Sequence, residues 1–204
     1  MCGIVGYIGK RNSLPILVDG LKRLEYRGYD SAGVAIINSA SEIKLFKKAG
    51  KIKEIESQIP IAEFEGNVGI GHTRWATHGE PSDRNAHPHR STSGKLAMIH
   101  NGIIENYALI KKDLLNKGYT FSSDTDTEVL LNFIEDIKIN NKSSLEEALR
   151  IALKRISGAY CILLIDEDDP ETIIAARKGS PLVIGVGKGE HFLGSDASPM
   201  LEYT

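Results

Sequence analysis

The sequence lacks most of the features that mark secreted, membrane and nucleic-acid-binding proteins. It has only two cysteines in 204 residues, Cys2 and Cys161, so it carries no disulfide framework. No apolar run approaches the roughly 20 residues that span a bilayer, and no basic segment followed by an apolar leader opens the chain. Lysine and arginine never run beyond two in a row, and the formal net charge of -2 at pH 7 disfavours a phosphate backbone as partner. We therefore expect a cytoplasmic protein that binds neither nucleic acid nor a membrane.

What is present is an ordinary globular composition, with 41% apolar and 25% charged residues. The periodicity predicts an amphipathic helix after Ser13 as its cap, and further helices behind Thr125 and Ser144, each with a glutamate three residues later. Strands come first, helices next and strands last, without regular alternation, which indicates helices packed on mostly antiparallel sheet in one domain. The predicted strands include residues 3–8, 33–37, 43–47, 159–165, 172–176, 182–186 and 191–193.

Cys2 is the first candidate for chemistry, because a methionine before a small residue is usually removed. Cys2 would then carry a thiol and a free α-amine on the same residue. A thiol with a pKa of about 8.5 and an amine with a pKa of about 7.7–8.0 titrate as a pair, so the amine can act as the general base for the thiol. The alternative is that Cys2 is a small buried apolar residue, as most free cysteines are.

Residues 71–81 form a second candidate, rich in groups that bind a small polar ligand. The guanidinium of Arg74 is a rigid fork that fits a carboxylate. Trp75 could cover a ligand and exclude water, and Thr77 and His78 add short polar groups. The alternative is a structural arginine in an ion pair beside a core tryptophan.

Two more polar segments follow. Asn101 and Gly102 can offer a side-chain amide and a closely approaching backbone N–H to an oxyanion, although Asn-Gly is also a common tight turn. In residues 124–128, the carboxylate of Asp124 or Asp126 could meet a substrate ammonium. Acidic groups at the start of a helix also complement its dipole, so helix capping is the alternative.

The six histidines raise the question of a metal site. His87 and His89 have a His-x-His spacing, and His72 and His78 lie upstream. Zinc sites need a defined third and usually a fourth ligand, and the sequence has no Cys-x-x-Cys or His-Glu-x-x-His pair. No glycine-rich phosphate loop precedes a helix either. We therefore expect neither a metal nor a cofactor.

Each of these signals is modest alone, but they form an ordered set. Its members are Met1-Cys2-Gly3-Ile4-Val5-Gly6, Arg23 to Gly33 with Arg27-Gly28-Tyr29-Asp30, His72-Thr73-Arg74-Trp75-Ala76-Thr77-His78-Gly79, Asn85-Ala86-His87-Pro88-His89, His100-Asn101-Gly102 with Glu105-Asn106, and Thr125-Asp126-Thr127-Glu128. Over essentially the whole chain this set resembles the N-terminal glutaminase domains of the glutamine–fructose-6-phosphate aminotransferase family, within the class II glutamine amidotransferases. Amidophosphoribosyltransferases usually have Gln at the position of Tyr29 and Tyr at that of Trp75, and asparagine synthetases usually have Pro at the position of Tyr29.

The resemblance implies an α+β fold, a four-layer αββα sandwich of the N-terminal-nucleophile hydrolase type. It implies that Cys2 is the nucleophile, that its α-amine is the base, and that Asn101 and Gly102 form the oxyanion hole.

The resemblance also assigns the substrate-binding groups. Arg74, with Thr77 and His78, would hold the α-carboxylate of L-glutamine, and Asp126 rather than Asp124 would take its α-ammonium. Trp75 would belong to the loop that closes over the bound amino acid. Arg27 lies near the site in this family, without a role that the sequence defines.

The family enzymes continue into a sugar isomerase domain that binds fructose 6-phosphate and receives the ammonia, and the full-length enzymes are expected to be homo-oligomers. We expect residues 1–204 to be a glutaminase domain truncated at its C-terminal end, without the isomerase domain. The alternatives are a glutaminase domain of another amidotransferase such as an amidophosphoribosyltransferase, a glutamine-binding module without catalysis, and a zinc-binding structural domain.

Overall fold

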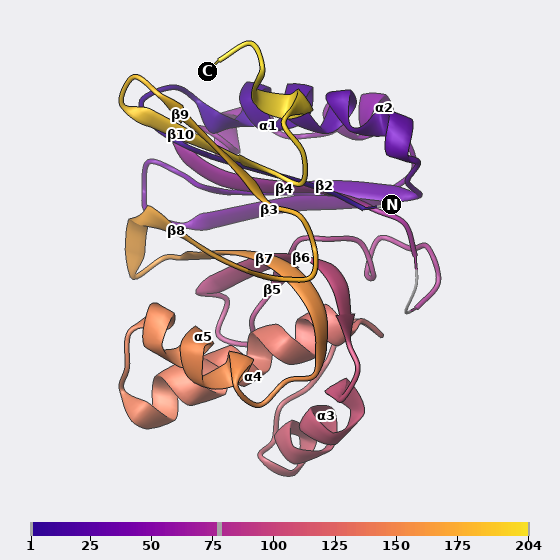
Figure 1. Ribbon diagram of the computed structural model, residues 1–204, viewed down its shortest axis with the longest axis vertical. Coiled ribbons are helices and arrows are strands. Elements are labelled where there is room, and N and C mark those ends of the chain that lie inside the picture. Colours follow the sequence, from indigo (N-terminus) through magenta and orange to yellow (C-terminus); the bar gives the residue numbers. More distant parts are fainter. Residues whose placement is uncertain (1, 77–78, 204) are drawn as a thin grey trace.

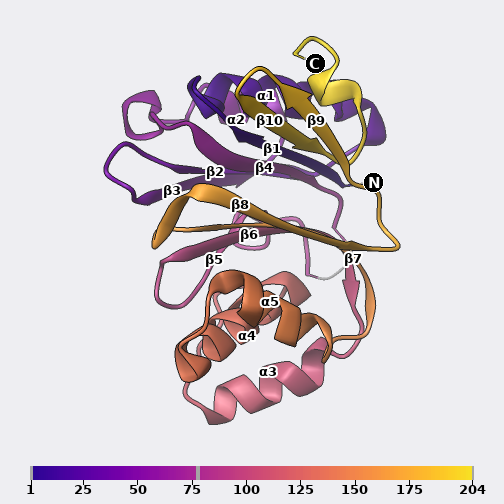
Figure 2. The same ribbon diagram turned by 60° about the vertical axis from the view of Figure 1, so that its left-hand side comes forward.

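The computed structural model describes residues 2–76 and 79–203, which form two antiparallel sheets stacked face to face with helices on both outer sides (Figure 1). From one outer surface to the other, the layers are helix, sheet, sheet and helix, and the turned view shows the same order (Figure 2). The predicted α+β fold with its four-layer αββα sandwich is therefore confirmed.

The first sheet has six strands in the order β3-β2-β4-β1-β10-β9. Its outer side is covered by helix α1, Ser13–Arg23, and the short helix α2, Ile52–Glu56. Gly69 and Gly71 leave room for α1, because a Cβ at either position would lie 2.8 or 3.2 Å from the side chains of Leu17 and Leu21, respectively. The strands are β1 (Gly3–Ile8), β2 (Ser31–Ile37), β3 (Ile43–Ala49), β4 (Val68–Arg74), β9 (Val183–Gly187) and β10 (Glu190–Gly194).

The second sheet has four strands in the order β5-β6-β7-β8, and three helices cover its outer side. Among these, α4 forms the centre of the helical layer, because every residue from Asp126 to Ile137 is buried. The strands are β5 (His89–Arg90), β6 (Leu96–Ile104), β7 (Gly158–Asp166) and β8 (Asp169–Lys178), and the helices are α3 (Tyr107–Asn116), α4 (Asp126–Asn141) and α5 (Leu145–Leu153). Short 3-10 turns lie at Glu25–Arg27 (η1), Ile61–Glu63 (η2) and Ser198–Met200 (η3).

Three apolar clusters hold the four layers together. One lies between α1 and the first sheet, a second between the two sheets, and the third between the second sheet and helices α3, α4 and α5. The cluster between the sheets includes Ile4, Ile70, Ile99 and Leu163, none of which is exposed to solvent. This apolar interior fixes the distance between the sheets. Residues at the end of the sandwich where both sheets meet are therefore held in place by both sheets.

The caps of the helices differ in part from the sequence prediction. Asn12, not Ser13, is the cap of α1, and its side-chain oxygen accepts a hydrogen bond from the N–H of Leu14 at 3.1 Å. The hydroxyl of Ser13 instead donates to the carbonyl of Gly66, which ties the helix to the loop before β4. Thr125 and Ser144 cap α4 and α5 as predicted, by accepting hydrogen bonds from the N–H groups three residues on.

Within residues 2–76 and 79–203, no helix is long and apolar enough to cross a membrane.

Candidate active site

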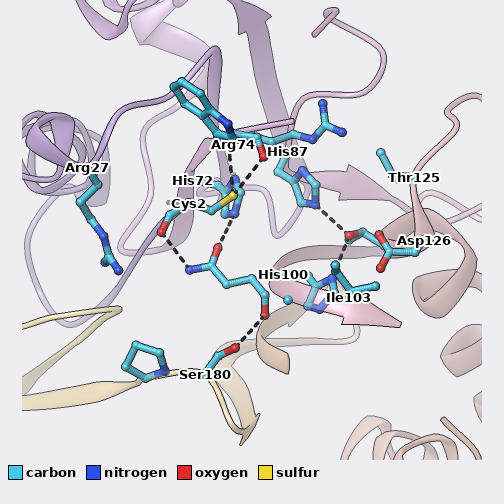
Figure 3. A pocket seen from close by; sticks show the side chains of 15 residues that line it. Cys2, Arg27, His72, Arg74, His87, His100, Ile103, Thr125, Asp126 and Ser180 are labelled. Carbon is cyan, nitrogen blue, oxygen red and sulfur yellow. Dashed lines mark hydrogen bonds between the residues drawn. The ribbon is translucent and has the colours of Figure 1, made fainter. Parts of the chain in front are cut away.

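A pocket of about 520 Å³ lies at one end of the sandwich, where β1, β4 and β6 meet the first turn of α4. Its walls bring together five residues that the sequence analysis selected from four separate segments. In the close view, Cys2 and Asp126 lie on opposite sides of the pocket (Figure 3). The five residues are Cys2, Arg74, Asn101, Gly102 and Asp126, and Trp75 lies beside them.

Cys2 lies immediately before β1, with its thiol against the backbone of Trp75. The Trp75 N–H donates to Sγ at 3.2 Å, and the thiol can donate to the Trp75 carbonyl at 3.6 Å. Burial raises the pKa of the thiol, whereas the Trp75 N–H and the positive charge of Arg74 lower it. The thiol is thus partly buried, fixed in position and open to the pocket.

Asn101 lies within β6, so the alternative interpretation of Asn101 and Gly102 as a tight turn is wrong. Its amide nitrogen donates to the carbonyl of Cys2 at 3.2 Å, and its amide oxygen lies 2.8 Å from Nε2 of His72. Gly102 has a φ of +129°, and a Cβ there would lie 2.0 Å from the carbonyl oxygen of Ala159 in β7. Only glycine fits this backbone conformation and this close approach.

Arg74 and Asp126 place opposite charges at the pocket wall. Arg74 is the last residue of β4, only 4% exposed, and its guanidinium donates to the carbonyl of Gly79 at 3.3 Å. Burial lowers the Arg74 pKa from its usual value, while the charges of Asp30 and Asp126 act in the opposite direction. Asp126 begins α4 and is only 5% exposed, and its carboxylate accepts the N–H of Ile104 at 2.8 Å. The N-terminus of a helix favours a carboxylate at this place.

Asp124, the other candidate for the ammonium site, does not line the pocket. Its half-exposed carboxylate forms an ion pair with Arg84 at 2.5 Å. Its backbone N–H donates to the side-chain oxygen of Asn85 at 3.0 Å. Asp126 is therefore the carboxylate of this segment that faces the pocket.

Trp75 is 53% exposed, and its ring lies close to Gly28, where a Cβ would come within 3.2 Å of it. The backbone around it is held by Asp30, whose N–H donates to the Arg74 carbonyl at 2.8 Å and whose carboxylate accepts the Ala76 N–H at 2.5 Å. A large ring at the mouth of the pocket, attached to a fixed strand end, is suited to covering a ligand. Thr77 and His78 lie outside the described residues.

A group of buried histidines lies behind the pocket, and we name it the histidine cluster: His72, His87, His89 and His100. Three of these residues were considered from the sequence as metal ligands, but the packing of all four together was not predicted. The rings of His72 and His87 stack with centroids 4.5 Å apart, and those of His87 and His89 meet edge to face at 4.7 Å. Burial lowers the pKa of every ring in the cluster, that of His72 to about 3. No group of side chains in residues 2–76 and 79–203 has the arrangement of a metal site. The spacing of polar residues around 72, 87 and 100 gave no signal for this packing.

Three other pocket residues were not predicted to act. Arg27 points toward the pocket in Figure 3, donates to the hydroxyl of Ser195 at 2.7 Å and lies 3.6 Å from Asp196. Ser180 and Pro181, in the loop between β8 and β9, line the opposite wall, and the Ser180 hydroxyl is 3.4 Å from the Asn101 carbonyl. Ser180 and Pro181 come from the last quarter of the chain, where the sequence offered no motif.

Sequence comparison shows the family to which the chain belongs. Residues 72–202 match the family described as "Glutamine amidotransferase domain". The chain belongs to this family. It is 59% identical over its full length to a glutamine–fructose-6-phosphate aminotransferase (isomerizing) of Bacteroides thetaiotaomicron, and 52% identical to the enzyme of that name from Pyrococcus horikoshii. The glutamine amidotransferase chain spans about a third of the length of these curated relatives, 33% and 34%.

Solved structures with lower sequence identity share the fold. A glutamine phosphoribosylpyrophosphate amidotransferase from B. subtilis superposes with a TM-score of 0.83 over 98% of this chain and 43% of that one, at 29% identity. A glutamine aminotransferase class-II domain protein from Silicibacter pomeroyi superposes with a TM-score of 0.64 over 95% of this chain and 88% of that one. At 14% identity, the second likeness shows the shared fold alone.

Proposed function

We propose that this amidotransferase domain hydrolyses the side-chain amide of L-glutamine to L-glutamate and ammonia through a thioester on Cys2. One observation carries the proposal. A single pocket is lined by a partly buried thiol, an amide donor and two opposite charges, which belong to Cys2, Asn101, Arg74 and Asp126. This is the set of groups that an amide of a zwitterionic amino acid requires.

The two charges suit the two ends of the substrate backbone. The Arg74 fork binds the α-carboxylate and Asp126 accepts hydrogen bonds from the α-ammonium, so the side-chain amide is directed toward Cys2. Thr77 and His78 complete the carboxylate site, and Trp75 closes over the bound amino acid. An amide that lacks these charges leaves both buried groups without partners, which is the basis of discrimination against it.

The first half of the reaction forms the thioester. Removal of Met1 exposes the α-amine of Cys2, which takes the thiol proton directly or through a water as the sulfur attacks the amide carbon. The carbonyl π electrons move to the oxygen, and the resulting oxyanion is stabilised by the Asn101 amide and the Gly102 N–H. When the tetrahedral intermediate collapses, the C–N bond breaks and nitrogen leaves as ammonia with the proton from the α-ammonium group of Cys2.

The second half returns the enzyme to its starting state. The neutral α-amine takes a proton from water, whose oxygen attacks the thioester carbon, and the same two donors stabilise the second oxyanion. Collapse breaks the C–S bond, releases L-glutamate and returns the proton to sulfur. Neither half uses a metal or a cofactor.

We further propose that the ammonia serves glucosamine 6-phosphate synthesis from fructose 6-phosphate, on a sugar isomerase domain of the full-length enzyme. The identity of 59% to a glutamine–fructose-6-phosphate aminotransferase, against 29% to the phosphoribosylpyrophosphate amidotransferase, supports this branch over the other. The full-length enzyme is proposed to be a cytoplasmic homo-oligomer. By itself, residues 1–204 release free ammonia.

The two cysteines provide a matched test. Cys2→Ala and Cys161→Ala make the same exchange in the pocket and in the core between the sheets. Glutamate and ammonia are measured after incubation with L-glutamine. The proposal expects equimolar products from wild type and Cys161→Ala and none from Cys2→Ala. Production by Cys2→Ala would overturn it.

A further inference from the structure

We propose that His72 is a positioning residue that fixes the orientation of the Asn101 amide, so that one of its two N–H groups faces the reacting carbonyl. The proposal rests on the proposed function, because it deepens the role of Asn101 in that reaction. His72 lies in β4 and Asn101 in β6, so the contact links the two sheets directly. Figure 3 shows His72 directly behind Cys2.

Hydrogen-bond accounting sets the orientation of the amide. The backbone carbonyl of Cys2 can only accept, so the Asn101 group that lies 3.2 Å from it must be the nitrogen. The amide oxygen therefore faces Nε2 of His72 at 2.8 Å, and because this oxygen can only accept, Nε2 must carry the proton. An amide nitrogen has two N–H groups. One is directed to Cys2, and the other remains for the pocket that Asn101 lines.

The ring of His72 is itself held in place. It is not exposed to solvent, and it stacks on the ring of His87 at 4.5 Å with an angle of 28° between the planes. His87 in turn lies 2.9 Å from the hydroxyl of Thr127, and His100, the residue before Asn101, lies 3.0 Å from the same hydroxyl. Thr127 follows Asp126 in the first turn of α4. The cluster thus connects the amide of Asn101 to the helix that carries the proposed ammonium site.

Burial keeps this arrangement neutral. It lowers the pKa of His72 to about 3, and the charges of His100 and Arg74 act in the same direction, whereas the hydrogen bonds to Asn101 and to the backbone of His100 oppose this shift. A neutral ring with its proton on Nε2 donates to Asn101 throughout the neutral pH range. Without that donor, the Asn101 oxygen loses its partner at His72, and the amide keeps only its contact with the carbonyl of Cys2.

The experiment compares His72→Phe, which keeps a ring but removes the donor, with His72→Gln, whose amide nitrogen reaches the place of Nε2. We measure kcat and KM for L-glutamine, and the dissociation constants of two ligands. L-glutamate γ-semialdehyde adds to the Cys2 thiol and places an oxygen in the oxyanion site, whereas L-glutamate binds without that bond.

For His72→Phe we expect kcat to fall about 10–100-fold with KM nearly unchanged, less than the loss of about 10²–10³ for removing an oxyanion donor outright. The affinity for the aldehyde should fall by a similar factor, whereas the affinity for glutamate should fall by less than twofold. His72→Gln should recover most of the lost kcat and most of the lost aldehyde affinity. Wild-type kcat in His72→Phe, equal loss of affinity for both ligands, or no recovery in His72→Gln would overturn the role.

A matched control and a replacement variant keep the outcome decisive. His89→Phe makes the same exchange in the histidine cluster, but His89 contacts Thr125 and Lys47 rather than Asn101. It should lower stability in urea without changing the ratio of the two affinities, and a selective loss of aldehyde affinity there would also overturn the role. If His72→Phe does not fold, His72→Asn takes its place, because its amide ends short of Asn101. A wild type that neither binds the aldehyde nor hydrolyses glutamine would instead refute the proposed function itself.

Discussion

Gly102 is the position where the fold and the proposed chemistry both depend on the absence of a side chain. A Cβ there would lie 2.0 Å from the Ala159 oxygen, although real Cβ atoms essentially never come within 3.0 Å of another heavy atom. In Gly102→Ala, strands β6 and β7 must therefore separate by about 1 Å. The φ of +129° adds strain, because residues with a side chain rarely adopt it.

The size of the effect follows from these two terms. A strained backbone conformation costs about 1–3 kcal/mol, and overpacking a close contact costs about 1–3 kcal/mol. Alanine also restricts the unfolded chain, which returns about 0.4–1 kcal/mol. The free energy of unfolding should therefore fall by about 1–6 kcal/mol. A shift of about 1 Å at the neighbouring Asn101 should lower kcat roughly 100-fold.

Gly118→Ala is the control for the backbone term alone. Gly118 also has a positive φ, +91°, but nothing lies within 4 Å of its Cβ position. Urea unfolding should show a smaller loss of stability for Gly118→Ala, with wild-type kcat, because it removes no contact near the pocket. Equal losses of stability in the two variants, or wild-type kcat in Gly102→Ala, would refute the reasoning.

Three further predictions follow from the pocket. Asn101→Ala should lower kcat by about 10²–10³, and unchanged turnover would remove it from the oxyanion hole. Asp126→Asn, which keeps the shape but removes the charge, should raise KM for glutamine while the aldehyde and glutamate affinities fall together; an unchanged KM would exclude it as the ammonium site. The histidine cluster should make the protein sensitive to acid. Because burial lowers these pKa values, below about pH 6.5 the unfolded chain binds protons that the folded protein does not. The free energy of unfolding, measured in urea, should therefore decrease as the pH is lowered, by up to about 1.4 kcal/mol per pH unit for each histidine. The decrease should be less steep in His89→Gln, and an equal slope in that variant would contradict this account.

Much of the fold could be predicted because its signals are local. The short apolar runs at 3–8 and 159–165 mark strands, and Thr125 followed by Glu128 marks the start of a helix. The position of a cap is less well determined: Asn12 and Ser13 are adjacent and both suited to capping, and only the loop at Gly66, distant in the sequence, settles which one acts.

The candidate site was predictable where a residue type carries its own chemistry, and not where packing creates the role. Cys2, Arg74 and Asp126 have distinctive groups, and the structure brings them to one pocket. The contact between His72 and Asn101 depends instead on the stacking of two sheets, and nothing in the spacing of 72 and 101 encodes it. Asn101 and Gly102 read equally as a turn until the pairing of β6 with β7 places them inside a strand.

The central claim, that Cys2 is the nucleophile, is tested most directly by covalent labelling. After intact mass has established removal of Met1, the protein is treated with 6-diazo-5-oxo-L-norleucine, a glutamine analogue that alkylates a nucleophilic thiol, and the adduct is mapped by peptide mass spectrometry. Cys161 is the internal control, because it is not exposed and burial raises its pKa to about 11. The account predicts one adduct per chain, on Cys2, that excess L-glutamine prevents. An adduct on Cys161, or none on the Met1-free protein, would contradict it.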